Sequence, residues 1–220
     1  MKDEDVMTVG LCGRSGAGKG TVGLVFAALG IPSVDTDAVY RSLTAPADEP
    51  SPCVTALTER FGPEVEAPDH SLNRAVLRKL VFGEGNERNL ADLNAISHRF
   101  ILEETRRIAD EWFGKGVPIV LLDAPVLYES GFDRFCDAVV CVTAPEEVLL
   151  SRIMARDGLS REEAEKRLAS QIPAEELEER ADFVIVNDGS LDELTDRVKQ
   201  TADALYERLA EKRRKREAGA

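Results

Sequence analysis

A glycine-rich stretch near the N-terminus constrains the fold more than any other part of this sequence. Residues 13–21 read GRSGAGKGT and directly follow the apolar run VMTVGLC at 6–12. The pattern G-x-x-x-x-G-K between a strand and a helix is typical of a phosphate-binding loop, in which glycines let successive backbone N–H groups surround phosphate oxygens. The helix that follows directs its positive N-terminus at the same anion, and Lys19 reaches the β- and γ-phosphates as a point charge. The residues expected to bind ATP here are Gly13, Arg14, Ser15, Gly16, Ala17, Gly18, Lys19, Gly20 and Thr21.

The flanks of this loop and one unusual position refine the interpretation. A glycine-rich surface turn with an exposed lysine would have a similar composition, but the strand before it and the helix after it favour the phosphate-binding loop. The position after Lys19 usually carries Ser or Thr, whose hydroxyl ligates Mg²⁺, whereas this chain has Gly20 followed by Thr21. The order GKGT is found in adenylate-kinase-like enzymes. We therefore expect Mg²⁺ to be held through water or by Thr21.

Short apolar runs separated by helical patterns predict the fold class. Continuous apolar strands that alternate with helices are typical of a parallel sheet covered on both faces. We therefore expect an α/β fold, a P-loop NTPase core with a five-stranded parallel sheet. The predicted strands are 6–12, 31–35, 117–123, 137–142 and 181–187, and the predicted helices flanking them include 21–29, 38–43 and the stretch from 190 to about 217.

Two regions interrupt the alternation of strands and helices. Residues 44–116 contain no convincing strand; a Pro-rich loop at their start and two helical patterns predict a helical insertion between the second and third strands. Residues 156–180 are polar, charged and helical, and their few apolar residues predict a mobile lid rather than a core helix. The nucleotide-binding core would then comprise 1–43, 117–155 and 181–220.

The composition limits the partners of the chain. The formal net charge of −13 repels nucleic acid and anionic membranes, so we expect neither as a partner. No apolar run approaches the roughly 20 residues of a membrane span. The four cysteines form no CxxC pair and the two histidines lie far apart, which argues against a zinc site and suits reduced thiols in a cytoplasmic protein. The acidic N-terminus does not resemble a signal peptide, and the basic run at 211–217 is expected to be a solvated helix end.

The sequence after the second predicted strand bears on the acceptor. Residues 35–37 read Asp-Thr-Asp, and ligands of open α/β sheets bind where strands end. An acceptor phosphate would need surrounding arginines, whereas an acceptor hydroxyl benefits from a carboxylate that orients it and takes its proton. The pair Asp35 and Asp37 therefore favours a hydroxyl acceptor. Either carboxylate could instead cap the helix predicted at 38–43.

Later charged residues could act during phosphoryl transfer. Arg152 and Arg156 are four residues apart and share one face of the helix after the fourth strand. Arg161, Arg167 and Gln171 lie on the predicted lid, whose closure would exclude water from the reaction. A surface salt bridge with a neighbouring glutamate is the alternative for each arginine, and we expect it for Arg161.

Two further residues are candidates on positional grounds. Asp123 ends the third predicted strand, a position that resembles the Walker-B carboxylate that holds Mg²⁺, often through water. His98 lies inside a long helical pattern, where a single histidine is more often structural than catalytic.

These motifs occur in an order that resembles one enzyme family over nearly the whole chain, to about residue 200. The segments are GLCGRSGAGKGTV, LGIPSVDTDAVYR, RFGPEV, SLNRAVLRKLVF, ISHRFI, VLLDAPVLYESGFD, SRIMARDGLSREEAEKRLASQIP and FVIVNDGSLDEL. Together they resemble the dephospho-CoA kinases. The resemblance implies transfer of the ATP γ-phosphate to the 3′-hydroxyl of the ribose of dephospho-CoA, with Mg²⁺, as the final step of coenzyme A biosynthesis. Residues 44–116 correspond to the CoA-binding domain of that family.

The resemblance also assigns roles to residues of this chain. Asp37 matches the general base, Lys19 and its loop hold ATP, and Arg156 matches the lid arginine that stabilises the transferring group. Arg41 matches an arginine on the acceptor side, and Asn187 falls where adenine contacts lie. The full expected sets are Asp37, Lys19 and Arg156 for catalysis, Arg152 and Asn187 with the loop for ATP, Asp35, Asp37, Arg41 and His98 for the acceptor, and Thr21 and Asp123 for Mg²⁺.

The chain departs from the family pattern at four places. The family usually has Gly-Ile where this loop has Arg14-Ser15, Ser or Thr where this chain has Gly20, His-Pro where it has His98-Arg99, and Pro-Gly where it has APADEPSP. An adenylate-kinase-like nucleotide or nucleoside kinase is the alternative that GKGT favours and Asp-Thr-Asp opposes. A regulatory module that binds ATP without transfer is a third reading, supported by Gly20 alone. We expect a monomer or a weak homo-oligomer.

Overall fold

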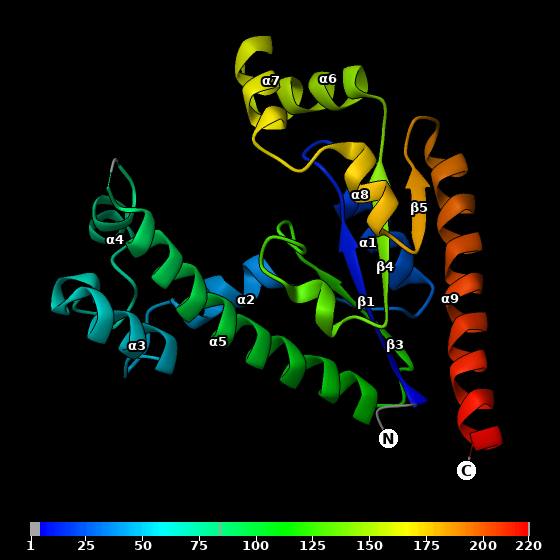
Figure 1. Ribbon diagram of the computed structural model, residues 1–220, viewed down its shortest axis with the longest axis horizontal. Coiled ribbons are helices and arrows are strands. Elements are labelled where there is room, and N and C mark those ends of the chain that lie inside the picture. The colour runs from blue at the N-terminus through cyan, green and yellow to red at the C-terminus, as the bar shows by residue number, and fades with distance from the viewer. Residues whose placement is uncertain (1–4, 84, 220) are drawn as a thin grey trace. The chain divides into compact units, whose positions relative to one another are not determined.

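The chain divides into two compact units, and the computed structural model describes residues 5–83 and 85–219 of it (Figure 1). The sheet unit holds the described residues up to Val34 and from Ala109 onward. The helical unit spans Asp35–Ile108. One long helix, α5 (Glu87–Gly114), contributes residues to both units.

The sheet unit is built on a five-stranded sheet in the order β2-β3-β1-β4-β5. The pairings of β1 with β3 and β4, and of β4 with β5, are parallel. β1 and β4 are buried almost throughout because apolar side chains occupy both faces, as expected for strands covered by helices on each side. The strands are β1 (Met7–Cys12), β2 (Ser33–Asp35), β3 (Ile119–Asp123), β4 (Ala138–Thr143) and β5 (Phe183–Val186). The predicted α/β class and all five predicted strands are confirmed, with ends that differ by up to two residues.

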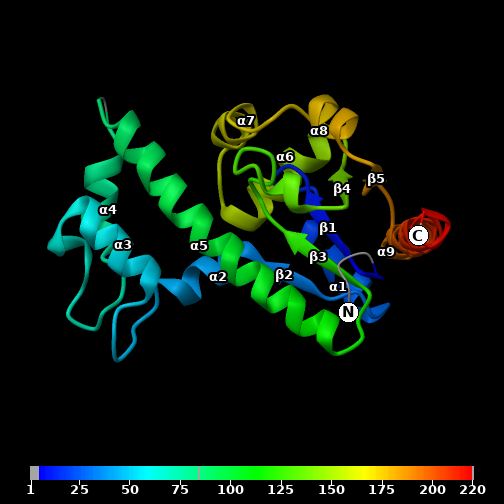
Figure 2. The same ribbon diagram turned by 60° about the horizontal axis from the view of Figure 1, so that its bottom comes forward.

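The helices of the sheet unit enclose its main hydrophobic core, which includes Phe26, Leu121, Ile153 and Val198. α9 packs against α1 and β5, and both views show it running alongside that strand (Figure 2). The helices are α1 (Lys19–Ala28), α6 (Glu146–Asp157), α7 (Arg161–Ala169), α8 (Ala174–Arg180) and α9 (Leu191–Gly219), with a 3₁₀ turn η3 at Phe132–Phe135.

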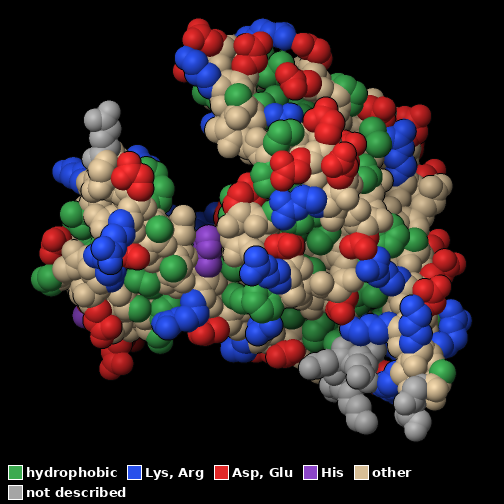
Figure 3. Space-filling view, in the orientation of Figure 1, with side chains coloured by type: hydrophobic (Ala, Val, Ile, Leu, Met, Phe, Trp, Pro, Cys, Tyr) green, Lys and Arg blue, Asp and Glu red, His purple; other side chains and the backbone are tan. Residues whose placement is uncertain are grey.

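The segment predicted as a lid contains α7 and α8. Ala164 and Leu168 of α7 belong to the main hydrophobic core, and Leu177 of α8 is buried. The exposed side chains of α7 form ion pairs along the helix, with acidic and basic groups interspersed over α6 and α7 (Figure 3). A few well-placed apolar residues therefore attach this polar segment to the core.

The helical unit has a separate, smaller core formed by Cys53, Leu57, Val65, Leu77 and others. Its elements are α2 (Thr36–Leu43), α3 (Pro52–Phe61), the 3₁₀ turn η2 (Pro63–Val65), α4 (Arg74–Val81) and α5 up to Ile108. From Thr36 to Ile108 the described residues contain no strand, only an isolated bridge between Glu66 and Leu72.

The helical unit differs in detail from the predicted insertion at 44–116. It already begins at Asp35, because Tyr40 and Leu43 of α2 pack against its core. The sequence analysis did not identify α3, whose start carries a recognisable signal. Ser51 caps the helix by accepting a hydrogen bond from the Val54 N–H, and Pro52 occupies the first turn.

Two findings concern the cysteines and the helices. All four cysteines are free thiols, and Cys12, Cys53 and Cys141 are buried. Within the described residues, no helix is both long and apolar enough to cross a membrane.

Candidate active site

The loop between β1 and α1 has the backbone that a phosphate-binding loop requires. Gly13, Gly16 and Gly18 have φ angles of 148°, 83° and 94°, in the region that L-amino acids rarely adopt. A Cβ atom built on Gly13 would lie 2.3 Å from the carbonyl oxygen of Val142 in β4, and one built on Gly18 would lie 2.3 Å from Asn187 Nδ2. Backbone conformation and close packing therefore both require glycine at these positions.

Gly20 is different from the other loop glycines. It lies within α1, and a Cβ atom built on it would meet no atom within 4 Å. Neither backbone geometry nor space therefore requires glycine here. Thr21 is exposed, and because successive helical residues are rotated by about 100°, its side chain leaves α1 in a different direction from a side chain at position 20.

The lysine of the loop and the carboxylate at the end of β3 lie together. Lys19 Nζ is 2.9 Å from Asp123 Oδ1, and the two side chains are only 16% and 23% exposed. β1 and β3 are neighbours in parallel register, with Leu11 opposite Asp123, so the two groups meet where these strands end. The sheet topology thus places a cation and a carboxylate beside the phosphate-binding loop.

Two other predicted ATP-binding residues contact the backbone of the loop. Asn187 is buried, and its Nδ2 donates to the carbonyl oxygen of Ala17 at 2.8 Å. Arg152 donates to the carbonyl oxygen of Gly16 at 3.3 Å and to Asn187 Oδ1 at 3.5 Å. Their side chains therefore support the loop from α6 and from the residue after β5.

The residues around Ser15 connect the loop to the predicted lid. The Ser15 N–H donates to Gln171 Oε1 at 3.0 Å, and Arg156 donates to Ser15 Oγ at 3.2 Å. Arg156 is held in turn by Asp157, 2.8 Å away. The guanidinium groups of Arg156 and Arg167 lower the pKa of the Asp157 carboxyl to about 2. Sequence analysis had not singled out Asp157, although it directly follows Arg156.

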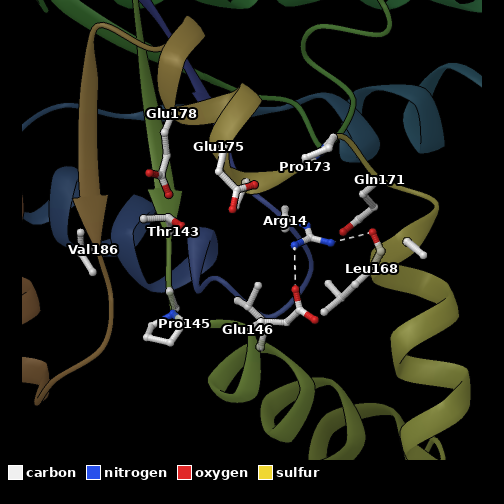
Figure 4. A pocket seen from close by; sticks show the side chains of 14 residues that line it. Arg14, Thr143, Pro145, Glu146, Leu168, Gln171, Pro173, Glu175, Glu178 and Val186 are labelled. Atoms are coloured by element: carbon white, nitrogen blue, oxygen red, sulfur yellow. Dashed lines mark hydrogen bonds and ion pairs between the residues drawn. The ribbon is translucent and has the colours of Figure 1, made fainter.

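Arg14 reaches into a pocket of about 490 Å³ between α6, α7 and α8 (Figure 4). It donates to the carbonyl oxygen of Leu168 at 2.7 Å and lies 3.8 Å from Glu146. Leu168 lies in the last turn of α7, where its carbonyl oxygen also accepts from the Gln171 N–H and the helix dipole favours a cation. The side chain of Arg14 therefore binds the lid segment.

Arg161 and Arg167 form ion pairs on the surface. Arg161 pairs with Glu147 at 2.6 Å and with Glu165 at 2.8 Å, which confirms the salt bridge expected for it. Arg167 pairs with Asp157.

The predicted acceptor-side residues belong to the helical unit. Asp35 caps α2 by accepting a hydrogen bond from the Ala38 N–H at 3.0 Å, and it lies 3.5 Å from Arg41. Asp37 is exposed in the first turn of the same helix, and among the described residues its carboxylate has no hydrogen-bond or ion-pair partner. His98 is half-buried on α5, and burial lowers its pKa. Capping therefore accounts for Asp35 and leaves Asp37 available.

The residues present suit a metal ion that is bound mainly by a nucleotide. Within the described part of the chain, no group of three or more His, Cys, Asp or Glu side chains could hold a metal ion. Mg²⁺ usually keeps several waters and binds through one or two carboxylates together with substrate phosphates. The Asp123 carboxylate beside the loop is a donor of this kind.

A family model and several relatives match this chain. The model described as dephospho-CoA kinase matches residues 7–193. A dephospho-CoA kinase from Syntrophotalea carbinolica is 40% identical over 193 residues, which cover 88% of this chain and 89% of the relative. One from Latilactobacillus sakei is 40% identical over 197 residues, which cover 90% of this chain and 95% of the relative.

Solved structures share the fold. A crystal structure of a Thermus thermophilus protein is similar with a TM-score of 0.72 and 32% identity, over 90% of this chain and 97% of that one. The dephospho-CoA kinase from Campylobacter jejuni has a TM-score of 0.64 and 23% identity, over 90% of this chain and 96% of its own. A shikimate kinase from Acinetobacter baumannii has a TM-score of 0.52 and 18% identity, over 93% and 96%. These likenesses confirm the P-loop NTPase fold.

Proposed function

The chain belongs to the dephospho-CoA kinase family, and we propose that it transfers the ATP γ-phosphate to the 3′-hydroxyl of the ribose of dephospho-CoA, giving CoA and ADP. It is a kinase, and the adenylate-kinase-like alternative is not favoured, because the relatives that match most of the chain are named dephospho-CoA kinases.

The observation that carries the proposal is the loop in its strand–loop–helix setting. Three glycines with positive φ angles turn the loop's backbone at the N-terminus of α1, and Lys19 is held at 2.9 Å from Asp123. N–H groups, a helix N-terminus and a lysine together suit the phosphates of ATP.

Asp37 is our proposed general base. A base must be free to accept a proton, and Asp37 is exposed and unpaired among the described residues, whereas Asp35 is occupied by the Ala38 N–H. Its proposed role is to orient the acceptor hydroxyl and to take its proton as the phosphoryl group is transferred. Arg41 and His98 are proposed to contact the acceptor, and the helical unit is proposed to bind its CoA moiety.

Arg156 is proposed to stabilise charge on the transferring phosphoryl group. The hydrogen bond to Ser15 Oγ brings the Arg156 guanidinium to the loop, and the ion pair with Asp157 orients that guanidinium. Mg²⁺ is proposed to bind near Asp123, with Thr21 as a further candidate, and when bound it would neutralise charge on the phosphate oxygens. Gly20 supplies no hydroxyl, so we expect the side chains of this protein to supply few of the ligands that bind the metal.

The test of the acceptor is a comparison of substrates. ADP release is measured with ATP and Mg²⁺ in the presence of dephospho-CoA, AMP, CMP or no acceptor. We expect acceptor-dependent ADP only with dephospho-CoA. ADP release with AMP or CMP alone would refute the proposed substrate and support a nucleotide kinase, and ATP binding without ADP release in any mixture would support a regulatory module.

The test of the base is the variant Asp37→Asn, which keeps the shape of the side chain but removes its basicity. We expect turnover to fall on the order of 10²-fold or more, a typical loss for a positioned base. Asp35→Asn is the matched comparison. Its amide oxygen can still accept a hydrogen bond from the Ala38 N–H, so its turnover should fall much less than that of Asp37→Asn. Unchanged turnover of Asp37→Asn would remove Asp37 from catalysis.

A further inference from the structure

Asn187 is fixed in place by its backbone as well as by burial. It directly follows β5, and its N–H donates to the carbonyl oxygen of Thr143, the last residue of β4, at 2.7 Å. The residue is 7% exposed. Its position therefore follows from the edge of the sheet and not from a mobile surface loop.

The side chain of Asn187 joins two groups that both contact the phosphate-binding loop. Its Nδ2 donates to the carbonyl oxygen of Ala17 at 2.8 Å, and its Oδ1 accepts from Arg152 at 3.5 Å. Arg152 also donates to the carbonyl oxygen of Gly16 at 3.3 Å. Two consecutive carbonyls of the loop thus accept hydrogen bonds from side chains of two separate elements.

The direction of these carbonyls decides whether the loop can bind an anion. A loop that surrounds phosphate with N–H groups must turn its carbonyl oxygens away, because they would repel the phosphate oxygens. A buried carbonyl without a donor is unfavourable, so each carbonyl turned away from the phosphate needs a partner on that side. Asn187 and Arg152 supply these partners for Ala17 and Gly16.

The packing at Gly18 shows how closely the loop rests on this amide. A Cβ atom at Gly18 would lie 2.3 Å from Asn187 Nδ2. The glycine therefore lets the loop approach the amide, and the amide in turn fills the space behind the loop.

We propose that Asn187 is a positioning residue of the phosphate-binding loop, which acts on ATP through the carbonyl of Ala17 and Arg152 rather than by contact with the nucleotide. The inference rests on the proposed use of ATP as donor. It assigns the Asn187 amide a different role from the adenine contact expected from the family resemblance.

The variant Asn187→Asp tests the hydrogen bond itself. It keeps the size of the side chain and an oxygen that faces Arg152, but a carboxylate presents an oxygen, not an N–H, to the Ala17 carbonyl 2.8 Å away. Protonation of the carboxyl restores a donor. The quantity to follow is the ratio of the ATP dissociation constant of Asn187→Asp to that of the wild type at the same pH. This ratio should fall as the pH is lowered from about 8 to about 5.5.

We expect the ATP dissociation constant of Asn187→Asp at pH 8 to rise about tenfold or more, from the cost of a buried carbonyl without a donor. Asn187→Ala removes the donor without adding an oxygen, so its ATP dissociation constant should rise about fivefold to tenfold, and its ratio to wild type should be independent of pH. If Asn187 had a purely structural role, both Asn187→Asp and Asn187→Ala would unfold at a lower temperature. The pH dependence of their ATP dissociation constants would then be the same.

The helical unit provides a matched control. Asn89 Nδ2 donates to the carbonyl oxygen of Leu80 at 2.9 Å, and its Oδ1 accepts from Arg60 at 2.9 Å. Asn89→Asp therefore makes the same chemical change beside a carbonyl and an arginine that belong to the other unit. Its ATP dissociation constant should equal that of wild type at each pH.

The outcomes separate the inference from the proposed function. Wild-type protein that does not bind ATP would overturn the proposed function. Wild-type protein that binds ATP, with an unchanged dissociation constant in Asn187→Ala or a pH-independent ratio in Asn187→Asp, would overturn the role of Asn187. If Asn187→Asp does not fold at pH 8, the dissociation constant of Asn187→Ala decides.

Discussion

Replacing Gly13 with alanine should destabilise the sheet unit, whereas replacing Gly20 with alanine should stabilise it. At Gly13 the φ angle is 148°, and an added Cβ atom would lie 2.3 Å from the carbonyl oxygen of Val142. That oxygen belongs to the backbone of β4, so it cannot rotate away as a flexible side chain could. At Gly20 the added Cβ atom meets nothing within 4 Å.

The two magnitudes follow from these surroundings. A non-glycine residue in an unfavourable backbone conformation costs about 1–3 kcal/mol, and forced overpacking of a core adds about 1–3 kcal/mol. We take a loss of about 4 kcal/mol for Gly13→Ala from these two contributions. Gly20→Ala, at the second residue of α1, should gain about 1 kcal/mol, because alanine restricts the unfolded chain and meets no clash in the folded one. In a chain of 220 residues, 1 kcal/mol shifts the unfolding midpoint by about 2–4 °C.

Thermal unfolding followed by far-UV circular dichroism measures both effects. We expect a midpoint about 8–16 °C below wild type for Gly13→Ala and about 2–4 °C above it for Gly20→Ala. An ATP titration on the same samples should show weakened binding in Gly13→Ala. Equal midpoints for Gly13→Ala and wild type, or a lower midpoint for Gly20→Ala, would refute the reasoning from backbone geometry.

Two further predictions concern charged groups. Lys19→Ala should lower kcat/KM on the order of 10²-fold, because it removes a preorganised charge from the phosphates. Lys199→Ala, on the exposed part of α9, is the control and should leave kcat/KM unchanged. Equal kcat/KM values for the two variants would contradict the phosphate-binding role of Lys19. Asp157→Asn should lower the unfolding midpoint at pH 7, because Arg156 and Arg167 depress the pKa of Asp157 to about 2. The ionised Asp157 carboxylate therefore stabilises the folded protein above the pKa that it has in the unfolded chain, and this stabilisation is lost as the pH falls to about 2. The difference from wild type should shrink over that range and in high salt, and a difference that stayed constant would argue against this cause.

The elements of the sheet could be predicted because their signals are local. The continuous apolar residues of β1, β3 and β4 require burial on both faces, and the glycine pattern after β1 is specific to one kind of turn. The family resemblance depends on the same local motifs and is confirmed by the match over residues 7–193. Local signals also indicated, correctly for the residues that the structure describes, that the region at 44–116 lacks strands.

Contacts between distant residues could not be predicted from these patterns. Arg14 belongs to the loop that is expected to bind ATP, and no sequence pattern indicated that its guanidinium also reaches Leu168, 154 residues away. Asp157 was overlooked, although it holds Arg156 at the loop. Neither side chain has a local pattern that distinguishes it from an ordinary surface charge.

By itself, the sequence determined the α/β class, the phosphate-binding loop and the family, because glycine spacing and runs of apolar residues act through the local backbone. Only the tertiary structure determined which side chains contact the phosphate-binding loop from other elements of the fold. The order β3-β1-β4-β5 brings Asp123 to Lys19, and the pairing of β4 with β5 brings Asn187 to Ala17, 170 residues away. Such contacts depend on which strands become neighbours, and strand order is a property of the folded chain rather than of any one segment.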